Sequence, residues 1–519
     1  MTRATSNLHA GVILMGVLAA TLTDAIAGSM LSFVRLDMMG DVNASVDEAA
    51  ILDYGYTAAK LAGFIFAAWA ASARPLRPLI LATAAMTLGC ALITLEMPIQ
   101  ILALARVFQG FAGGVIVVTG QTYLLFSYQR SSQPWVQTAF ALGAVVAPAT
   151  ITPFAQGWAR DAYTWELVFA AVVPIGLLGL ATLVKIAPDV ESNSPVTAFD
   201  PYAFSLVVIG ASCTTFFFNQ GNRWDWGEDP TIRLCAVASI AATATLAIWG
   251  YRRRKDEWLI RFGVFANPGF AFGFIVSFVA GFALLGSSFL IPSFAISVLR
   301  MTPTELGQLL LPSAVTFACT LGLTALAVRR LQVSPVVTVP FGIVGFMTSM
   351  WLMGTGTSAI GFPQLLPAVL LRGAALGFLF LSITLVALAG LSRRFTSSGV
   401  ALFNLGRTIG GLAGVAFLQT LIEDETIRNR AILAAHVVPG RYEVVERLQR
   451  ASEHLSTHGL NPVEAAKASA ALLGKEVAHE ATMIAFNTGF AAVVMFFVLA
   501  VPVIIGSKVL IGKYIVPNR

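Results

Sequence analysis

Apolar runs long enough to cross a lipid bilayer recur from one end of this chain to the other. A helix needs about 20 predominantly apolar residues to span the hydrocarbon core, and the sequence contains 14 such runs. Of the 519 residues, 57% are hydrophobic and only 12% are charged, which is too apolar for a soluble fold. We therefore predict an all-α polytopic membrane protein with 14 transmembrane helices. The expected spans are 10–33, 50–72, 77–95, 98–120, 135–158, 164–184, 203–220, 232–250, 268–294, 306–327, 335–354, 363–388, 397–421 and 481–507.

Basic residues indicate the orientation of these spans. An even number of spans places both termini on one side of the membrane. The loops on that side contain Arg74 and Arg77, the basic run 252–255, Arg329-Arg330 and Arg393-Arg394. Because cytoplasmic loops carry an excess of lysine and arginine, both termini are expected in the cytoplasm.

Charge, cysteine and histidine patterns exclude several classes of function. The net charge of +6 does not by itself indicate nucleic-acid binding, because the location of the charges matters more than their sum. The four cysteines lie in apolar segments without a CxxC pair, so neither a disulfide framework nor a metal site is predicted. His454 and His458 have the spacing of a ligand pair but no clear third ligand nearby. We predict no metal and no cofactor, and we find no nucleophile elbow or P-loop that would indicate an enzyme.

A buried arginine marks the fourth predicted span. Arg106 lies inside an apolar run, followed by Gln109 and by Gly110, Gly113 and Gly114. A charge at that depth is costly unless it faces protein or a water-filled cavity, and the glycines allow another helix to approach closely. Two interpretations stay open: a structural arginine that ties helices together through backbone carbonyls, and a residue of the transport path.

Polar residues of the first two spans are expected to face the same interior. Asp24 is a lone carboxylate in the first span, and Asp53, Tyr56 and Lys60 share one face of the second span through spacings of three and four. Asp24 is interpreted either as a group that exchanges a proton near neutral pH or as the permanent ion-pair partner of Lys60 or Arg106. Both interpretations are compatible with a single mechanism.

Later spans add further candidates. Pro148, followed by Pro153, is expected to bend the fifth span. Arg372 lies beside small residues in the twelfth span, as Arg106 does in the fourth. This short repeated pattern agrees with the internal symmetry on which many secondary transporters are built. Asn404 and Arg407 share a glycine-rich face of the thirteenth span, where structural packing is the main interpretation.

The order of the spans predicts a division of the chain. Residues 1–186 are expected to form an N-terminal six-helix bundle, and residues 263–519 a C-terminal six-helix bundle with an extracytoplasmic loop at 422–480. Residues 187–262 are expected to form an inserted helix pair and a cytoplasmic linker.

Several short motifs occur in a specific order along the spans. They are Asp24, Tyr56, Arg106-Val-Phe-Gln109-Gly110, Trp165 with Phe169, Phe265–Phe270, Leu371-Arg372-Gly373 and Arg407–Gly411. In this order they resemble the major facilitator superfamily, specifically its 14-span drug:proton antiporter branch of the multidrug efflux type. The resemblance implies the major-facilitator fold, two six-helix bundles that rock about a central cavity plus an inserted helix pair. It also implies a proton-coupling role for the arginine of the fourth span.

Two departures from that pattern concern gating and direction. The loop after the second span has Ser72 where the family has an aspartate, which puts the usual charge relay of that loop in doubt. The fifth-span motif lacks its closing glycines after Ala147-Pro148, and in the family that motif is associated with export.

The working hypothesis is a proton-coupled antiporter of a bacterial inner membrane that exports drugs or other small compounds. Asp24, Arg106 and Lys60 are expected to couple protons. The deep charges are Lys60, Arg106, Arg372 and Arg407 against Asp24 and Asp53, which favours neutral lipophilic or anionic substrates over dications. The expected partners are protons, the small-molecule substrate and membrane lipid. The resemblance adds a periplasmic adaptor with an outer-membrane channel as possible partners. The 422–480 loop either docks such an adaptor or only caps the bundle. The alternatives are an importer or a specific metabolite exporter of the same fold, and a non-transporting membrane sensor or structural protein.

Overall fold

The described part of the chain is helical throughout. The computed structural model describes residues 3–29, 38–95, 97–152, 164–185, 198–252, 259–438 and 440–514. The α-helices are α1 (Arg3–Ser29), α3 (Val46–Ala70), α4 (Leu76–Ile93), α5 (Ile99–Ser127), α6 (Gln133–Ala141), α8 (Glu166–Lys185), α9 (Pro201–Gln220), α10 (Pro230–Arg252), α11 (Pro268–Ser297), α12 (Pro303–Arg330), α13 (Val339–Gly354), α14 (Phe362–Leu388), α15 (Arg393–His436), α16 (Tyr442–Thr457) and α17 (Pro462–Tyr514). Short 3-10 turns are η1 (Arg130–Ser132), η3 (Phe262–Ala266) and η4 (Pro335–Thr338), and η2 (Leu142–Ile151) is a π-helix.

The polytopic all-α prediction is confirmed. Within the described ranges, 12 helices are long and apolar enough to cross a membrane. The two remaining expected spans correspond to α3, whose apolar run is interrupted by Asp53 and Lys60, and to α6 with η2, which is described only as far as Thr152. Pro148 lies inside η2. Since proline lacks a backbone N–H, the wider π turn there agrees with the predicted bend; Pro153 lies outside the described residues.

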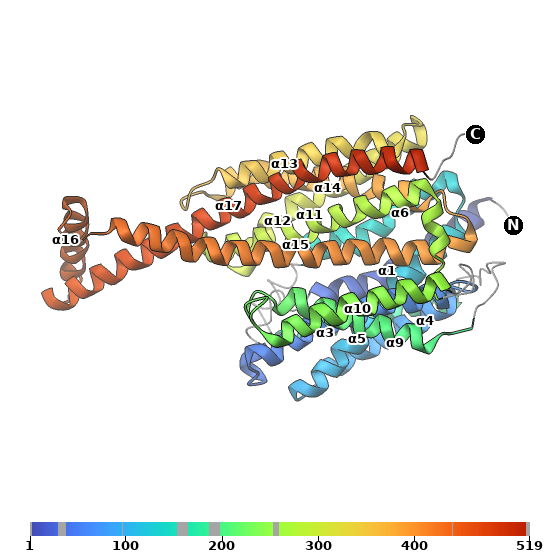
Figure 1. The fold of residues 1–519 in the computed structure, drawn as a ribbon, viewed down its shortest axis with the longest axis horizontal. Coiled ribbons are helices and arrows are strands. Elements are labelled where there is room, and N and C mark those ends of the chain that lie inside the picture. The colour runs from blue at the N-terminus through green and yellow to red at the C-terminus, as the bar shows by residue number, and fades with distance from the viewer. Residues whose placement is uncertain are drawn as a thin grey trace.

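Two groups of helices lie side by side (Figure 1). In the N-terminal group α3 packs along α5, α4 packs against α5 and α8, and α1 packs against α8 and η2. In the C-terminal group α11 packs along α15, α12 along α14, and α13 between α14 and α17. The groups meet where α12 and α14 contact α6 and where α15 contacts α3 and α5. The site described below lies beside this second contact.

The helix pair α9–α10 packs mainly on the outside of the N-terminal group. The two helices pack against each other, and α9 contacts α3 and the edge of α15. At the end of the pair, the Trp226 indole donates a hydrogen bond to the Thr420 hydroxyl at 3.1 Å. The pair is thus joined to both groups through α3 and α15.

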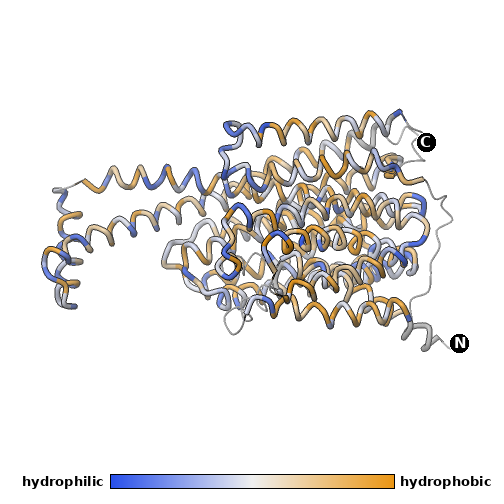
Figure 2. Tube along the Cα trace, turned by 90° about the horizontal axis from the view of Figure 1, so that it is seen from below, coloured by the Kyte–Doolittle hydropathy of each residue, from blue (hydrophilic) through white to orange (hydrophobic). Residues whose placement is uncertain are grey.

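The segment at 422–480, expected as a long loop with alanine-rich helical stretches, is mostly helical. Helix α15 continues to His436 and α17 begins at Pro462, so both helices extend beyond the bundle and carry α16 at their tip (Figure 1). With 44 and 53 residues, they are ~66 and ~80 Å long, well above the ~30 Å of a hydrocarbon core. Figure 2 shows hydrophobic colouring over the bundle and more hydrophilic colouring along this protrusion. We call residues 422–480 the stalk.

The beginning of α1 and the end of α17 lie at the same end of the bundle, opposite the stalk (Figure 1). An even number of crossings requires this arrangement. The basic loops predict that this end, which holds both termini, faces the cytoplasm.

Candidate functional site

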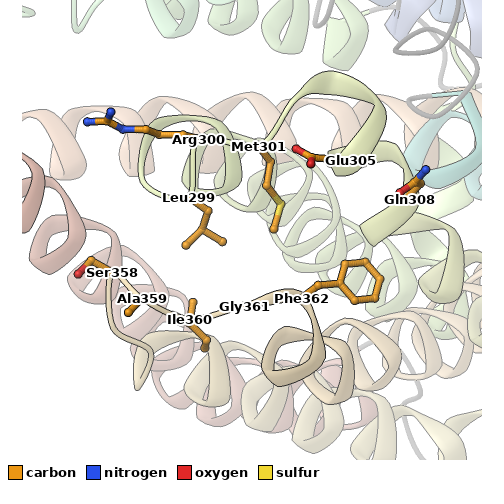
Figure 3. Close-up of a pocket in the computed structure, with 10 residues that line it drawn as sticks. All are labelled: Leu299, Arg300, Met301, Glu305, Gln308, Ser358, Ala359, Ile360, Gly361 and Phe362. Atoms are coloured by element: carbon orange, nitrogen blue, oxygen red, sulfur yellow. The ribbon is translucent and has the colours of Figure 1, made fainter.

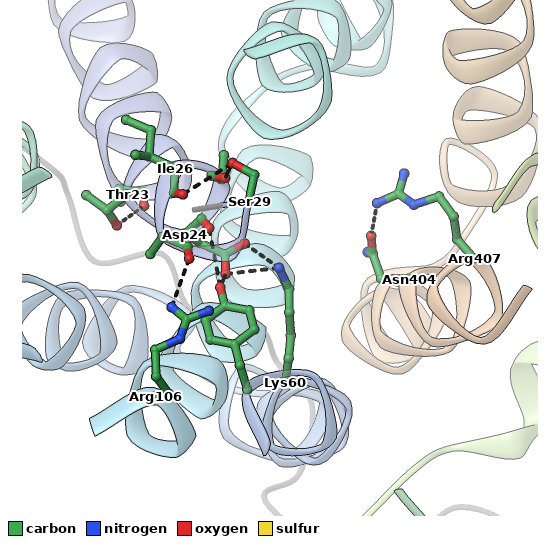
Figure 4. A network of polar contacts seen from close by, with 12 residues as sticks. Thr23, Asp24, Ile26, Ser29, Lys60, Arg106, Asn404 and Arg407 are labelled. Atoms are coloured by element: carbon green, nitrogen blue, oxygen red, sulfur yellow. Dashed lines mark hydrogen bonds and ion pairs between the residues drawn. The ribbon is translucent and has the colours of Figure 1, made fainter. Parts of the chain in front are cut away.

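Asp24 accepts hydrogen bonds from two side chains of a neighbouring helix. It lies on α1 and is only 3% exposed. The Tyr56 hydroxyl donates to Asp24 Oδ1 at 2.6 Å, and Lys60 Nζ lies 2.7 Å from Oδ2 and 3.0 Å from Oδ1 (Figure 4). Tyr56 and Lys60 are four residues apart on α3 and therefore lie on one face. Tyr56 and Lys60, predicted to share one face of the second span, thus both contact Asp24.

Glycines on α5 determine how closely the helices around Asp24 approach. A Cβ atom on Gly110 would lie 2.0 Å from the carbonyl oxygen of Tyr56, and one on Gly113 would lie 1.9 Å from Asp24 Oδ1. No other residue type fits at either position without moving the site. The glycines thus set the distance between α5 and the two helices that carry the acid and its partners.

Arg106 reaches the same cluster without pairing with the carboxylate. It is 1% exposed, and its Nη1 donates to the backbone oxygen of Ala27 at 2.8 Å and to Gln109 Oε1 at 3.0 Å. Its guanidinium carbon lies 4.2 Å from the centroid of the Tyr56 ring. The ion-pair partner of Asp24 is therefore Lys60 rather than Arg106. The contacts of Arg106 are those of the carbonyl-tying interpretation, with a cation–π contact to Tyr56 in addition.

The remaining N-terminal candidates surround this cluster. Gln109 donates a hydrogen bond to Cys90 Sγ at 3.3 Å, so its amide bridges Arg106 and α4. Asp53 is half-buried one turn before Tyr56 on α3. Gln109 thus contacts the cluster through Arg106, and Asp53 lies on the helix that carries Tyr56 and Lys60.

Two arginines of the C-terminal group have different surroundings. Arg372 is 1% exposed, and its Nε and Nη2 donate to the Ser287 and Ser288 hydroxyls at 3.0 and 3.1 Å. Arg407 is half-buried and donates to Asn404 Oδ1 at 2.5 Å. Figure 4 shows the Arg407 side chain directed toward the side of the view that holds the Asp24 cluster.

A chain of amides crosses from the C-terminal to the N-terminal group. Asn404 Nδ2 donates to Gln121 Oε1 at 3.2 Å, Gln121 Nε2 donates to Gln137 Oε1 at 2.9 Å, and Gln137 Nε2 donates to Gln133 Oε1 at 3.2 Å. Gln133 in turn donates to the Tyr128 carbonyl at 3.0 Å. The sequence analysis did not predict this chain. Its only signal in the sequence is the occurrence of three glutamines in or beside apolar helices, two of them spaced by four.

A pocket of about 610 Å³ lies away from this cluster, in the C-terminal group (Figure 3). Two loops and the start of a helix line it: residues 299–301, Glu305 and Gln308 of α12, and residues 358–362. Its polar members are Arg300, Glu305, Gln308 and Ser358. Ser358 of the second loop donates to Glu480 Oε1 at 2.6 Å, which places the pocket beside the base of the stalk. Figure 3 shows Phe362 and Met301 facing the opening from the two loops.

The sequence of this helical chain matches a known protein family. Residues 16–415 match the Major Facilitator Superfamily, and the chain belongs to it. It is accordingly a secondary transporter and a multi-pass membrane protein. The resemblance noted from the sequence motifs is confirmed.

Characterised relatives are similar over most of their length. The multidrug export protein EmrB of Haemophilus influenzae is 24% identical over 436 residues, which cover 83% of this chain and 85% of that protein. The colistin resistance protein EmrB of Acinetobacter baumannii is 23% identical over 416 residues, 79% of each chain. The fatty acid resistance protein FarB of Neisseria gonorrhoeae is 21% identical over 412 residues, 78% of each chain.

Solved structures share the fold. A bacterial homologue of the human lysosomal transporter Spinster, in an inward-facing and unoccupied conformation, superposes with a TM-score of 0.54 at 14% identity, covering 97% of this chain and 98% of that one. The human organic anion transporter MFSD10 (TETRAN) superposes with a TM-score of 0.52 at 11% identity, covering 94% and 98%. These similarities support the major-facilitator fold.

Proposed function

We propose that this transporter exports small lipophilic compounds in exchange for protons. The single observation that carries the proposal is the buried Asp24–Lys60 ion pair, a titratable carboxylate at membrane depth with one cationic partner. The relatives named for multidrug export and for fatty acid resistance support the direction and the broad substrate range.

The ion pair suggests how proton binding changes the protein. When a proton binds the Asp24 carboxylate, the attraction to Lys60 Nζ at 2.7 Å is lost, and the lysine is free to take another position. A proton shifts the balance between two conformations only if one of them binds it more tightly. In our proposal the outward-open state is the one that holds Asp24 protonated. Arg106 supports the site by holding α1 and the Tyr56 ring in place.

The moving parts in this proposal are residues 1–186 and residues 263–519, with 187–262 as the inserted pair and linker. The hydrogen bond between Asn404 and Gln121 joins the two bodies. This hydrogen bond has to break when the two bodies separate at Asn404 and Gln121. Proton release at Asp24 and breakage of this contact are then two events of one cycle.

We place the protein in a bacterial inner membrane with both termini in the cytoplasm, on the basis of the basic loops. In that orientation the stalk projects on the opposite, periplasmic side. Apolar side chains are exposed along it, among them Ile427, Tyr442 and Val463, at 65, 75 and 68%. A periplasmic adaptor that leads to an outer-membrane channel is the partner we propose for this surface.

Shortening the stalk tests that partner. Residues 437–461, which contain α16, are replaced by a short Gly-Ser turn, and transport is measured both in inverted vesicles and in intact two-membrane cells. The adaptor proposal expects unchanged vesicle transport and lost resistance of the cells. Unchanged resistance would mean that the stalk only caps the bundle.

Proton exchange itself is tested by substrate-induced proton movement. Inverted vesicles with an acid interior are loaded with a pH-sensitive dye, and a panel of lipophilic compounds is added one at a time. The proposal expects the interior to become more alkaline on addition of a transported compound. Counterflow in oriented vesicles separates this from import or from narrow metabolite export, and a sensor or structural protein would move no solute.

A further inference from the structure

Two deep arginines of the C-terminal group, Arg372 and Arg407, form no ion pair within the described ranges, and Arg407 makes the fewer hydrogen bonds. Within the described ranges Arg407 makes one hydrogen bond, to Asn404, and forms no ion pair. Its guanidinium carbon lies 4.8 Å from the centroid of the Phe380 ring and 5.7 Å from that of Phe403. The aromatic faces orient the guanidinium but carry no net negative charge that would neutralise it.

The other deep cations of this kind are better satisfied. Lys60 pairs with Asp24, Arg106 donates to a backbone carbonyl and to Gln109, and Arg372 donates to two serine hydroxyls. A guanidinium has five N–H donors in a fixed fork, and Arg407 uses one of them. The residue is half-buried rather than fully buried, so part of its surface is open to a ligand.

The position of Arg407 places it where a substrate would pass. Asn404, one turn earlier on α15, contacts Gln121 of the N-terminal group. Residues three apart on a helix lie on the same face, so Arg407 also faces the junction between the two groups. A cation at such a junction, without a carboxylate partner, attracts an anion more strongly than it would in water.

We propose that Arg407 binds the negatively charged group of a lipophilic organic anion, such as a carboxylate, at the junction of the two bundles. This inference rests on the proposed function and names the substrate class. The anion accepts N–H donors of Arg407 that have no protein acceptor. Its apolar part lies beside Phe380, which retains 9% exposure. A ligand that also draws Arg407 away from Asn404 would disturb the contact of Asn404 with Gln121.

The test compares three probes of the same ring system in binding to the purified full-length protein. They are 2-naphthoate, its neutral isostere 2-naphthamide, and a 2-naphthyl trimethylammonium. Wild-type protein should prefer the carboxylate, and Arg407→Gln should lose about 10- to 100-fold of that preference while it binds the amide as before. Arg407→Lys keeps the charge and should keep most of the preference. The control Arg447→Gln removes an exposed arginine of the stalk and should behave as wild type.

A second measurement uses wild-type protein, so that the test does not depend on whether the Arg407→Gln variant folds. Phenylglyoxal adducts at Arg407 and Arg447 are quantified by peptide mass spectrometry. We expect 2-naphthoate to reduce the adduct yield at Arg407 several-fold and leave Arg447 unchanged, and 2-naphthamide to protect neither residue. Unchanged carboxylate preference in Arg407→Gln, or no protection of Arg407 by 2-naphthoate, would overturn the proposal.

Failure of this site and failure of the export proposal have different signatures. Carboxylate binding that depends on Arg407, without any gradient-driven transport, would leave the anion site standing and remove proton-coupled export. Gradient-driven transport together with carboxylate binding that does not depend on Arg407 would support proton-coupled export and remove the anion site.

Discussion

Lys60 Nζ lies 2.7 Å from Asp24 Oδ2, and this pair joins the first two helices of the transporter inside the membrane-spanning bundle. Removing one partner of a buried ion pair leaves the other charge without compensation, which is strongly unfavourable. Proton binding to Asp24 has the same local consequence for Lys60. In our proposal, proton binding to this pair therefore changes which conformation is stable.

Tyr56 provides a test that leaves the ion pair in place. Tyr56→Phe removes the 2.6 Å hydrogen bond to Asp24 but keeps the ring against which Arg106 lies. Because hydrogen bonds to a charged acceptor contribute about 1.5–3 kcal/mol, we expect proton-driven uptake to fall about 10-fold or more. Tyr54→Phe, which removes the hydroxyl from a ring packed edge-on against Phe216, is the control and should transport normally. Equal rates for both variants would remove Tyr56 from the coupling site.

Gly113 and Gly110 test the packing around the acid. An alanine at Gly113 places a methyl group where Asp24 Oδ1 lies, and one at Gly110 meets the Tyr56 carbonyl. Overpacking of this kind costs about 1–3 kcal/mol, so both variants should unfold at lower temperature in detergent. The control Gly11→Ala has no atom within 4 Å of the new Cβ and should not lower the melting temperature. Wild-type melting of Gly113→Ala would mean that the helices are further apart than described here.

The hydrogen bond between Asn404 and Gln121 tests the contact between the bundles. We expect a double-mutant cycle with Asn404→Ala and Gln121→Ala, measured as free energy of unfolding in SDS mixed micelles, to give a coupling energy of about 0.6–1.7 kcal/mol. As a control, Gln121→Ala combined with Ser239→Ala in the outer helix pair should give additive effects. Zero coupling for the first cycle would show that this contact does not hold the bundles together.

The sequence predicted an inward polar face on the second span because two physical constraints act on it. Polar residues inside a membrane must face protein, and the spacing of Tyr56 and Lys60 places them on one face. It left open whether Lys60 or Arg106 pairs with Asp24. That choice depends on how closely α5 approaches α1 and α3, which the glycines determine only in three dimensions.

Two features were beyond the reach of hydropathy. Neutral amides such as Gln121 and Gln137 add no charge to a span, and some of their partners are distant in sequence. The sequence pattern therefore did not predict the hydrogen-bonded chain of amides that leads to Asn404. The stalk was expected as a long loop with alanine-rich helical stretches, since hydropathy falls at residue 421. Hydropathy records where the apolar surface ends, whereas the alanine-rich sequence beyond it continues the helix.

The most direct test of the account is gradient-driven uptake in inverted vesicles by wild-type protein and by Asp24→Asn. Asparagine preserves the size of the side chain and cannot take up a proton under these conditions. We expect wild-type vesicles with an acid interior to accumulate a transported dye, to lose it when the gradient collapses, and Asp24→Asn vesicles to accumulate none while the folded protein still binds the dye. Full gradient-dependent accumulation by Asp24→Asn would contradict the assignment of Asp24 as the proton-coupling residue.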